Sequence, residues 1–236
     1  MDHIMKLIMP MAGEGSRFSS AGYTVPKPMI DINGKPMFVR TIESIGLEFD
    51  DYIFITRREH DLRDSVLEHY PDAKVIELDA LTEGAACSVA TAEPYMNSED
   101  SFCVCNCDQF FEWDSSKFEA HRDNDGVLLL FEDPQRDPKW SFAAYQPDSE
   151  RISAVAEKDP ISSYATAGLY YWRRWDTYNK SLRLMIQEDD RTNGEFYLCP
   201  VYNHTIRLQN TTISGIIIDK MNGVGTPEDL DAWSST

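Results

Sequence analysis

Basic residues are scarce in this chain. Its 236 residues include 22 Lys and Arg against 40 Asp and Glu, giving a formal net charge of −18 at pH 7. Nucleic acids and anionic membrane surfaces are bound through basic patches, so the charge balance argues against both as the main partner. A polyphosphate can be bound only where the few cations are concentrated and a divalent cation assists.

Long apolar runs and disulfide-rich segments are also missing. No stretch approaches the roughly 18 uninterrupted apolar residues that cross a membrane, and the short run from Ile4 contains Pro10, unlike a signal peptide. The five cysteines are odd in number and too sparse for a disulfide scaffold. The five histidines form no Ser-His or Cys-His motif. We therefore expect a soluble cytoplasmic protein without a nucleophilic side chain in its site.

A glycine-rich loop follows the first apolar segment. The loop reads Met11-Ala12-Gly13-Glu14-Gly15-Ser16-Arg17. Gly13 and Gly15 let backbone N–H groups approach an anion closely, and Arg17 adds a planar fork suited to phosphate. The loop lacks the third glycine of the dinucleotide fingerprint and the Gly-Lys-Ser/Thr of a P-loop. By itself it fits equally well a strand-to-helix turn with a solvated arginine.

A lysine between two prolines strengthens the phosphate interpretation. Pro26-Lys27-Pro28 is followed by Asn33-Gly34-Lys35-Pro36, and the proline after Lys27 predicts extended backbone at that residue. Together with the loop, these segments resemble the opening signature of the nucleotidyltransferases, or pyrophosphorylases, that make nucleotide-activated sugars. That signature is a small apolar strand end, then G-x-G-x-R, P-K-P and x-G-K-P. The resemblance continues in the expected order as far as Leu230.

Short apolar segments alternate with amphipathic ones in the first half. The expected strands are residues 5–9, 52–56, 74–78 and 102–107. The expected helices between them are residues 36–47, 59–70 and 83–92. This alternation predicts βαβ units in a mostly parallel sheet, with the ligand at the carboxyl ends of the strands.

Strands follow one another more closely after Asp108. The expected strands are residues 126–131, 141–146, 152–157, 165–172 and 211–220. The expected helices are residues 173–188, 198–208 and 226–233. The resemblance implies an α/β fold, a Rossmann-like three-layer αβα arrangement with a mixed, mostly parallel central sheet of the GT-A-like type. We expect one domain over residues 1–236, with a nucleotide-binding half at about 1–125 and an acceptor-binding half at about 126–236.

Three cysteines alternate along the strand that precedes Asp108. Cys103, Cys105 and Cys107 would share one face of a strand at roughly 6–7 Å spacing, too far apart to converge on one ion. They also lack the paired C-x-x-C of zinc sites, so buried thiols are expected. Asp108 ends this strand where ligands bind. The resemblance implies that Asp108 binds Mg²⁺, which takes one or two carboxylates plus phosphate oxygens.

The second metal ligand is less well specified. In many family members an aspartate stands two residues before the glycine of the closing G-T-P-E-D-L turn, and Gly223 occupies that position here. Asp219 is our first choice and Asn222 the second. The third alternative is Asp108 alone, with water and phosphate completing the coordination.

Further site residues come from matching the family's later motifs. Glu83 and Gly84 match a segment that contacts the base, although the same residues fit a helix N-terminus capped by Thr82. The resemblance implies acceptor contacts from Lys158, Gly168 and Glu195, although Asp159 interrupts the E-K-P-like motif at Lys158. Without the resemblance, Lys158 would be an exposed charge at a strand end and Glu195 an acid in a helix's first turn.

The reaction implied is transfer of NMP from an NTP to a phosphomonoester, with release of pyrophosphate. The acceptor implied is a sugar 1-phosphate, for glycan or capsule-type biosynthesis. In this scheme residues 11–16 bind the nucleotide. Arg17 and the amides of residues 13–16 hold the pyrophosphate, Lys27 the α-phosphate and Lys158 the incoming phosphate, with Mg²⁺ on Asp108. Catalysis then rests on positioning and charge neutralisation.

Three other functions remain open at this point. One is a cytidylyltransferase for an amino alcohol, polyol or amino-acid phosphate, since the base is not specified. Another is a GT-A glycosyltransferase, although Asp108-Gln109-Phe110 lacks the usual D-x-D. The third is a nucleotide-binding regulatory module without turnover. The expected partners are an NTP and a phosphorylated small molecule, and a homo-oligomer is left open.

Overall fold

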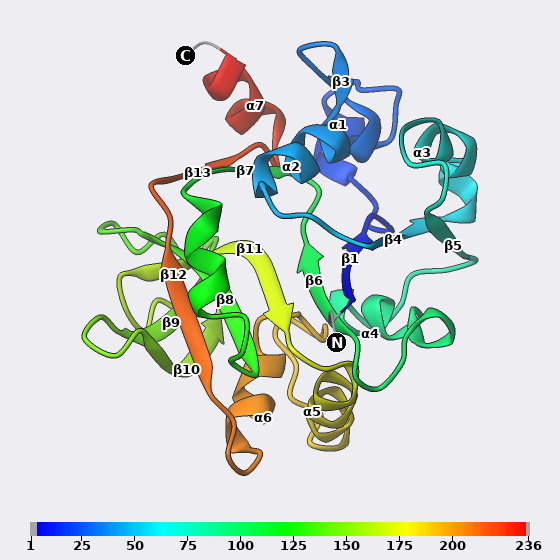
Figure 1. The fold of residues 1–236 in the computed structure, drawn as a ribbon. Coiled ribbons are helices and arrows are strands. Elements are labelled where there is room, and N and C mark those ends of the chain that lie inside the picture. Colours follow the sequence, from blue (N-terminus) through cyan, green and yellow to red (C-terminus); the bar gives the residue numbers. More distant parts are fainter. Residues whose placement is uncertain (1–3, 235–236) are drawn as a thin grey trace.

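A mixed sheet forms the centre of the molecule (Figure 1). The computed structural model describes residues 4–234, and within them nine strands are joined in the order β5-β4-β1-β6-β11-β8-β12-β10-β9. In that order, the strands are β5 (Lys74–Leu78), β4 (Asp51–Arg57), β1 (Met5–Pro10), β6 (Ser101–Cys105), β11 (Tyr164–Trp172), β8 (Gly126–Glu132), β12 (Ile213–Ile217), β10 (Arg151–Glu157) and β9 (Ser141–Gln146).

The two halves of this sheet differ in how their strands pair. β5, β4, β1 and β6 are parallel to one another, as are β12 and β8. β11 and β10 run antiparallel to their neighbours. Parallel neighbours need a crossover, which the helices of the first half supply, whereas the short connection between β9 and β10 suits their antiparallel pairing. The expected α/β class with a mixed sheet is confirmed, but the expectation of a mostly parallel sheet is wrong, because β11 and β10 pair antiparallel with every neighbour.

Helices cover both faces of the sheet. The helices on one face are α4 (Ala85–Ala90), α5 (Trp175–Gln187) and α6 (Val201–Arg207), and those on the other are α2 (Met37–Ile45) and α3 (Arg63–His69). Side chains alternate along a strand, so Ile8 of β1 packs in the core beneath the first group and Leu7 in the core beneath the second. The three-layer αβα arrangement is therefore observed. No helix within residues 4–234 is long and apolar enough to cross a membrane.

Smaller elements surround the carboxyl ends of β1 and β6. They are α1 (Ser16–Ser20), the β2 (Asp31–Ile32) and β3 (Lys35–Pro36) pair, the β7 (Gln109–Glu112) and β13 (Lys220–Gly223) pair, and α7 (Pro227–Ser234). Residues 4–234 also contain four 3-10 turns: η1 (Lys27–Met29), η2 (Arg58–His60), η3 (Glu93–Tyr95) and η4 (Ser115–Ala120). Figure 1 shows α7, in red, close to the β7–β13 pair and α2.

Several expected boundaries are wrong. The helix expected at 59–70 is divided into η2 and α3 because Asp61 adopts a left-handed φ of 50°. The strand expected at 211–220 ends at Ile217, and the chain then changes partner to form β13 against β7. The extended backbone expected at Lys27 is also wrong, since Lys27 begins the 3-10 turn η1. This turn directs the Lys27 side chain toward the end of β6, where Asp108 lies.

Candidate functional site

The loop after β1 forms one wall of a cleft. Gly15 adopts φ 61° as the residue before α1, and a Cβ added there would lie 3.3 Å from Cβ of Lys27. The loop therefore turns directly against Lys27. It borders a pocket of about 540 Å³ whose lining includes Ala12, Gly13, Glu14, Gly15, Ser16, Thr82, Gly84, Ala85, Asn106 and Glu195.

One predicted loop residue does not line this pocket. Met11 is 3% exposed and packs in the core beneath α2. Its backbone N–H donates to the carbonyl of Ile55 at 2.7 Å. Met11 thus fixes the base of the loop to β4, while the five residues after it, 12–16, face the pocket.

Lys27 and Asp108 form the charged centre of the cleft. Lys27 Nζ lies 2.5 Å from Asp108 Oδ2, and the two side chains are 23% and 17% exposed. Burial by itself lowers the pKa of Lys27, but the Asp108 carboxylate and Cys107 outweigh it, so that the pKa of Lys27 is raised. Lys27 is therefore a fixed cation at neutral pH, positioned where the carboxyl end of β6 meets the glycine loop.

The turn after β13 closes the cleft around this pair. The N–H of Val224 donates to the Asp108 carbonyl at 2.9 Å, and a Cβ added at Gly225 would lie 2.8 Å from Asp108 Oδ2. A pocket of about 140 Å³ is lined by Gly15, Ser16, Arg17, Phe18, Lys27 and Gly225. The chain thus brings Arg17 and Lys27 together at a small polar pocket beside the larger one, as required for binding adjacent phosphates.

A third pocket adjoins the other side of Asp108. It has a volume of about 250 Å³ and shares Ala85 and Asn106 with the loop pocket. Its lining includes Asn106, Asp108, Gln109, Lys139, Trp140, Ser141, Glu157, Thr166, Tyr170 and Tyr197. Burial raises the pKa of Glu157, although Ser141 donates a hydrogen bond to its carboxylate. The three pockets therefore meet along one cleft with Asp108 near its middle.

Gly168 lies beneath this third pocket. It has φ 81° at an irregularity in the β11–β8 pairing, and its carbonyl accepts from the N–H of Asn106 at 3.1 Å. A Cβ at Gly168 would lie 1.4 Å from Oε1 of Gln109. Glycine is therefore required so that Asn106 and Gln109 can reach the pocket lining.

The other two predicted acceptor residues lie at the rim. Lys158 is exposed with φ 56°, and its Nζ donates to the Tyr197 hydroxyl at 2.7 Å and lies 4.6 Å from the centre of that ring. Lys139 rather than Lys158 lines the third pocket. Glu195 lies in the lining of the loop pocket, so the structure brings it toward the predicted nucleotide side.

Glu83 points away from the pocket that Gly84 lines. Its side chain is 67% exposed and its Oε2 accepts from Arg191 at 2.5 Å. The helix-cap alternative also fails for Thr82, because α4 begins after Gly84 and the Thr82 hydroxyl contacts the Gly84 carbonyl and the Ser88 hydroxyl. Glu83 is thus part of a contact with residues near 191–196, a contact that spacing along the sequence did not indicate.

The structure does not bring the proposed second metal ligands to Asp108. Along the β7–β13 ladder, Asp108 lies at one end, against Val224, whereas the N–H of Asp219 donates to the Glu112 carbonyl at the other. At about 3.3 Å per residue the ladder separates Asp219 from Asp108 by roughly 15 Å. Within residues 4–234 no group of three or more His, Cys, Asp or Glu side chains is arranged to hold a metal ion.

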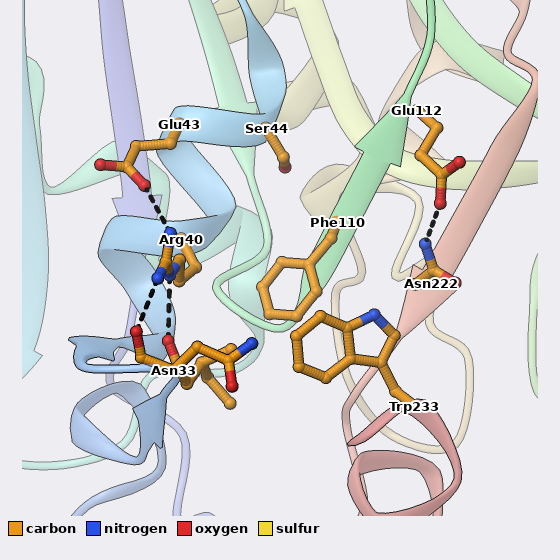
Figure 2. A pocket seen from close by; sticks show the side chains of 9 residues that line it. Asn33, Arg40, Glu43, Ser44, Phe110, Glu112, Asn222 and Trp233 are labelled. Atoms are coloured by element: carbon orange, nitrogen blue, oxygen red, sulfur yellow. Dashed lines mark hydrogen bonds and ion pairs between the residues drawn. The ribbon is translucent and has the colours of Figure 1, made fainter. Parts of the chain in front are cut away.

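Asn222 belongs to a separate pocket of about 390 Å³ behind this ladder. Its Nδ2 donates to Glu112 Oε1 at 2.9 Å. Figure 2 shows Asn222 and Glu112 on one wall of that pocket, with Arg40 on the opposite wall bonded to Asn33 and Glu43. The polar groups of this pocket are therefore largely engaged with one another.

The three alternating cysteines are buried thiols, as expected. Cys103 and Cys105 are 0% exposed and Cys107 is 7% exposed, and all three pack in the core beneath α2. Burial raises the pKa of Cys107 to about 12. These thiols are therefore protonated at neutral pH, as is typical of structural cysteines.

Several lining residues were missed by the sequence argument. Asn106 and Gln109 flank Asp108, and their polar side chains at a strand end were the available signal. Trp140 and Tyr197 gave no such signal because an aromatic residue at a strand or loop end is ordinary core or surface composition. Their place in the lining depends on β9 and the segment after α5 meeting at the same pocket.

Comparisons with known proteins agree with this geometry. The model of the family described as nucleotidyl transferase matches residues 6–210. The chain is 27% identical over 232 residues to the bifunctional protein GlmU of Methanocaldococcus jannaschii, covering 96% of this chain and 52% of that protein. It is 23% identical over 180 residues to a mannose-1-phosphate guanyltransferase of Aspergillus oryzae, covering 70% and 49%. The chain thus spans about half the length of these relatives.

Solved structures give the same result. The nucleoside-diphosphate-sugar pyrophosphorylase of Vibrio cholerae RC9 matches with a TM-score of 0.84 at 27% identity, covering 98% of this chain and 100% of that one. The inositol-1-phosphate CTP transferase of T. maritima matches with a TM-score of 0.76 at 18% identity, which supports the fold alone. With the family match covering most of its length and the loop, lysine and aspartate of the family signature meeting in one cleft, the chain belongs to the nucleotidyl transferase family.

Proposed function

We propose that this protein transfers NMP from an NTP to a sugar 1-phosphate, forming an NDP-sugar and releasing pyrophosphate. The observation that carries the proposal is the meeting of three pockets around the Lys27–Asp108 pair, whose Nζ and Oδ2 atoms lie 2.5 Å apart. One pocket is bordered by the glycine loop, one by Arg17 and Lys27, and one by hydrogen-bonding side chains. This arrangement suits a nucleotide, its departing phosphates and an acceptor, respectively.

The reaction needs positioning more than acid–base chemistry. A phosphate oxygen of the acceptor attacks the α-phosphorus, the bond from that phosphorus to the bridging oxygen breaks, and pyrophosphate leaves with the electron pair. The attacking oxygen is already anionic, so no protein group has to remove a proton. We assign Lys27 to the charge on the α-phosphate, and Arg17 with the loop amides to the pyrophosphate.

Mg²⁺ fits the residues at this centre. Asp108 offers a carboxylate, a hard oxygen ligand of the kind Mg²⁺ prefers, and substrate phosphates supply further oxygens. When bound, the ion would neutralise phosphate charge and hold the phosphates in register. Asp108 would hold it, and the contact to Lys27 keeps that carboxylate facing the cleft.

The third pocket, which we call the acceptor pocket, favours a hydroxyl-rich molecule. Its lining combines the carboxylate of Glu157 with the neutral polar groups of Gln109, Ser141 and Thr166. Such groups satisfy sugar hydroxyls in both directions, and Trp140 adds an apolar face for the ring. Two relatives carry names that specify sugar substrates, mannose-1-phosphate guanyltransferase and nucleoside-diphosphate-sugar pyrophosphorylase. We propose Lys158 as a contact at the rim of this pocket, Gly168 as its support, and Glu195 as a contact from the side of the loop pocket.

A substrate panel tests this function. The four NTPs are each combined with sugar 1-phosphates and with amino-alcohol, polyol and amino-acid phosphates, and pyrophosphate is measured with Mg²⁺ and with EDTA. We expect Mg²⁺-dependent release with one NTP and a sugar 1-phosphate. Release with a non-sugar phosphate instead would support the cytidylyltransferase alternative. Nucleotide binding without pyrophosphate from any pair would overturn the proposed activity in favour of a regulatory module.

A further inference from the structure

A short hairpin joins the two substrate pockets. Thr192 and Glu195 exchange two backbone hydrogen bonds of 3.0 Å, and the residues between them, Asn193 and Gly194, have φ of 51° and 83°. Positive φ at both central residues gives a tight turn with little freedom. We call residues 189–197 the strap. Its Glu195 lines the loop pocket and its Tyr197 lines the acceptor pocket.

The strap is hydrogen-bonded to the chain segment that begins α4. The Phe196 N–H donates to the Glu83 carbonyl at 2.8 Å, and the Phe196 carbonyl accepts from the Ala86 N–H at 3.1 Å. Between these bonds, a Cβ added at Gly84 would lie 2.4 Å from the Phe196 carbonyl oxygen. The backbones thus approach so closely that glycine is required at residue 84.

Arg191 makes the side-chain contacts that hold the strap on this segment. One nitrogen, Nη2, donates to Glu83 Oε2 at 2.5 Å, and Nη1 donates to the Gly194 carbonyl at 3.1 Å. Its guanidinium carbon lies 3.9 Å from the centre of the Phe196 ring. The side chain is 28% exposed. Arg191 therefore bonds to Gly194 within the hairpin, covers the buried Phe196 ring and forms an ion pair with Glu83 of the facing segment.

We propose that Arg191 is a positioning residue that fixes the strap and so determines affinity for both substrates. This rests on the proposed function. Neither Arg191 nor its contact atoms line the pockets, so its effect passes through Glu195 on the nucleotide side and Tyr197 on the acceptor side. Both residues are exposed or half-buried on a loop, which makes their placement depend on how firmly the strap is held.

The chain contains a matched control for the test. Arg207 of α6 donates to both oxygens of Glu188 at 2.6 and 2.7 Å, an arginine–glutamate pair only slightly longer than that of Arg191. Arg207 lines none of the three cleft pockets. Arg191→Met and Arg207→Met each remove one guanidinium while keeping an apolar stem. They separate the loss of an ion pair from the loss of strap position.

The first experiment measures kcat and the KM of each substrate by pyrophosphate release. We expect Arg191→Met to raise both KM values by roughly tenfold, the sum of one ion pair and one cation–π contact, while Arg207→Met leaves them within twofold. The double variant Glu83→Arg with Arg191→Glu restores only the ion pair and should recover only the part of the loss that the pair contributes. Equal KM values for Arg191→Met and wild type would overturn the proposal.

The second experiment does not depend on turnover. Hydrogen exchange of the Phe196 and Ala86 amides reports the two backbone bonds of the strap directly. We expect faster exchange at these amides in Arg191→Met than in Arg207→Met, with similar exchange elsewhere. Unchanged protection there would overturn the role of Arg191, whatever the substrates are. Absence of pyrophosphate release from the wild type would count against the proposed function alone.

Discussion

Replacing Lys27 with methionine tests the centre of the site most directly. The ammonium lies 2.5 Å from Asp108 Oδ2, and both side chains are less than one quarter exposed. At an effective dielectric constant of about 20, this separation gives an attraction of about 7 kcal/mol, an upper bound. Desolvation of the two charges offsets most of it, which leaves a net coupling of about 1–2 kcal/mol.

The ion pair can be tested by its effect on stability, and the role of Lys27 by its effect on turnover. A double-mutant cycle of Lys27→Met and Asp108→Asn, followed by urea unfolding, should give a coupling energy of about 1–2 kcal/mol. Because the pKa of Lys27 is raised in the folded protein, this stabilisation is fully present below the ordinary lysine pKa of 10.5 and is lost as the pH rises through the folded value. Turnover of Lys27→Met should fall by about a hundredfold or more, since the α-phosphate loses its cation.

Lys35 provides the matched control. Lys35 is close in sequence, forms an ion pair with Glu43 and has a half-exposed side chain outside the three cleft pockets. Lys35→Met should therefore keep kcat within about threefold of wild type, the change typical of a surface ion pair. A coupling energy near zero for Lys27 and Asp108, together with near-wild-type turnover of Lys27→Met, would refute the reasoning. Coupling with normal turnover would retain the ion pair and remove the catalytic role.

Three further predictions concern other parts of the cleft. Burial raises the pKa of Glu157, so the ionised carboxylate destabilises the folded protein at neutral pH. Glu157→Gln should therefore raise the urea midpoint of unfolding at neutral pH. This gain in stability should vanish as the pH falls toward 4.5, the ordinary pKa of glutamate. A gain unchanged at low pH would contradict this. Gly84→Ala should lower the unfolding free energy by about 3 kcal/mol or more, because the added Cβ meets the Phe196 backbone. Gly13→Ala, which has open space at its Cβ, should lower it by less than about 1 kcal/mol. Equal losses in the two variants would refute the close approach at Gly84. Asp219→Asn should keep pyrophosphate release and its Mg²⁺ dependence within about threefold of wild type, because the residue lies at the far end of the β7–β13 ladder; a hundredfold loss would show that it acts in catalysis.

Much of the fold followed from local pattern. The strand expected at 74–78 coincides with β5, that at 141–146 coincides with β9, and those at 5–9 and 52–56 differ from β1 and β4 by one residue at one or both ends. For β1 and β4 the signal is a continuous apolar run bounded by turns, because most of each strand is buried on both faces. The segments that failed are short pairings such as β7 with β13, whose stability comes from a partner more than one hundred residues away.

The sequence by itself identified most residues of the loop pocket and of the Lys27–Asp108 centre. The glycine loop with Arg17 and the position of Asp108 depend on local features, namely glycine conformation and the end of a buried strand, whereas Lys27 was identified from the P-K-P signature although its expected backbone was wrong. The carboxyl ends of parallel strands then meet at one edge of the sheet. These residues were therefore identified from the sequence together with a known signature, and the structure brings them into one cleft.

Only the tertiary structure decided the contacts between distant segments. Asp219 lies far from Asp108, and Glu83 forms an ion pair with Arg191. Lys139 and Glu157 line the acceptor pocket. Each outcome depends on the register of a strand pair or on the path of a loop over the sheet. A shift of one residue turns a strand's side chains to the opposite face, so residue type and spacing alone cannot fix such contacts.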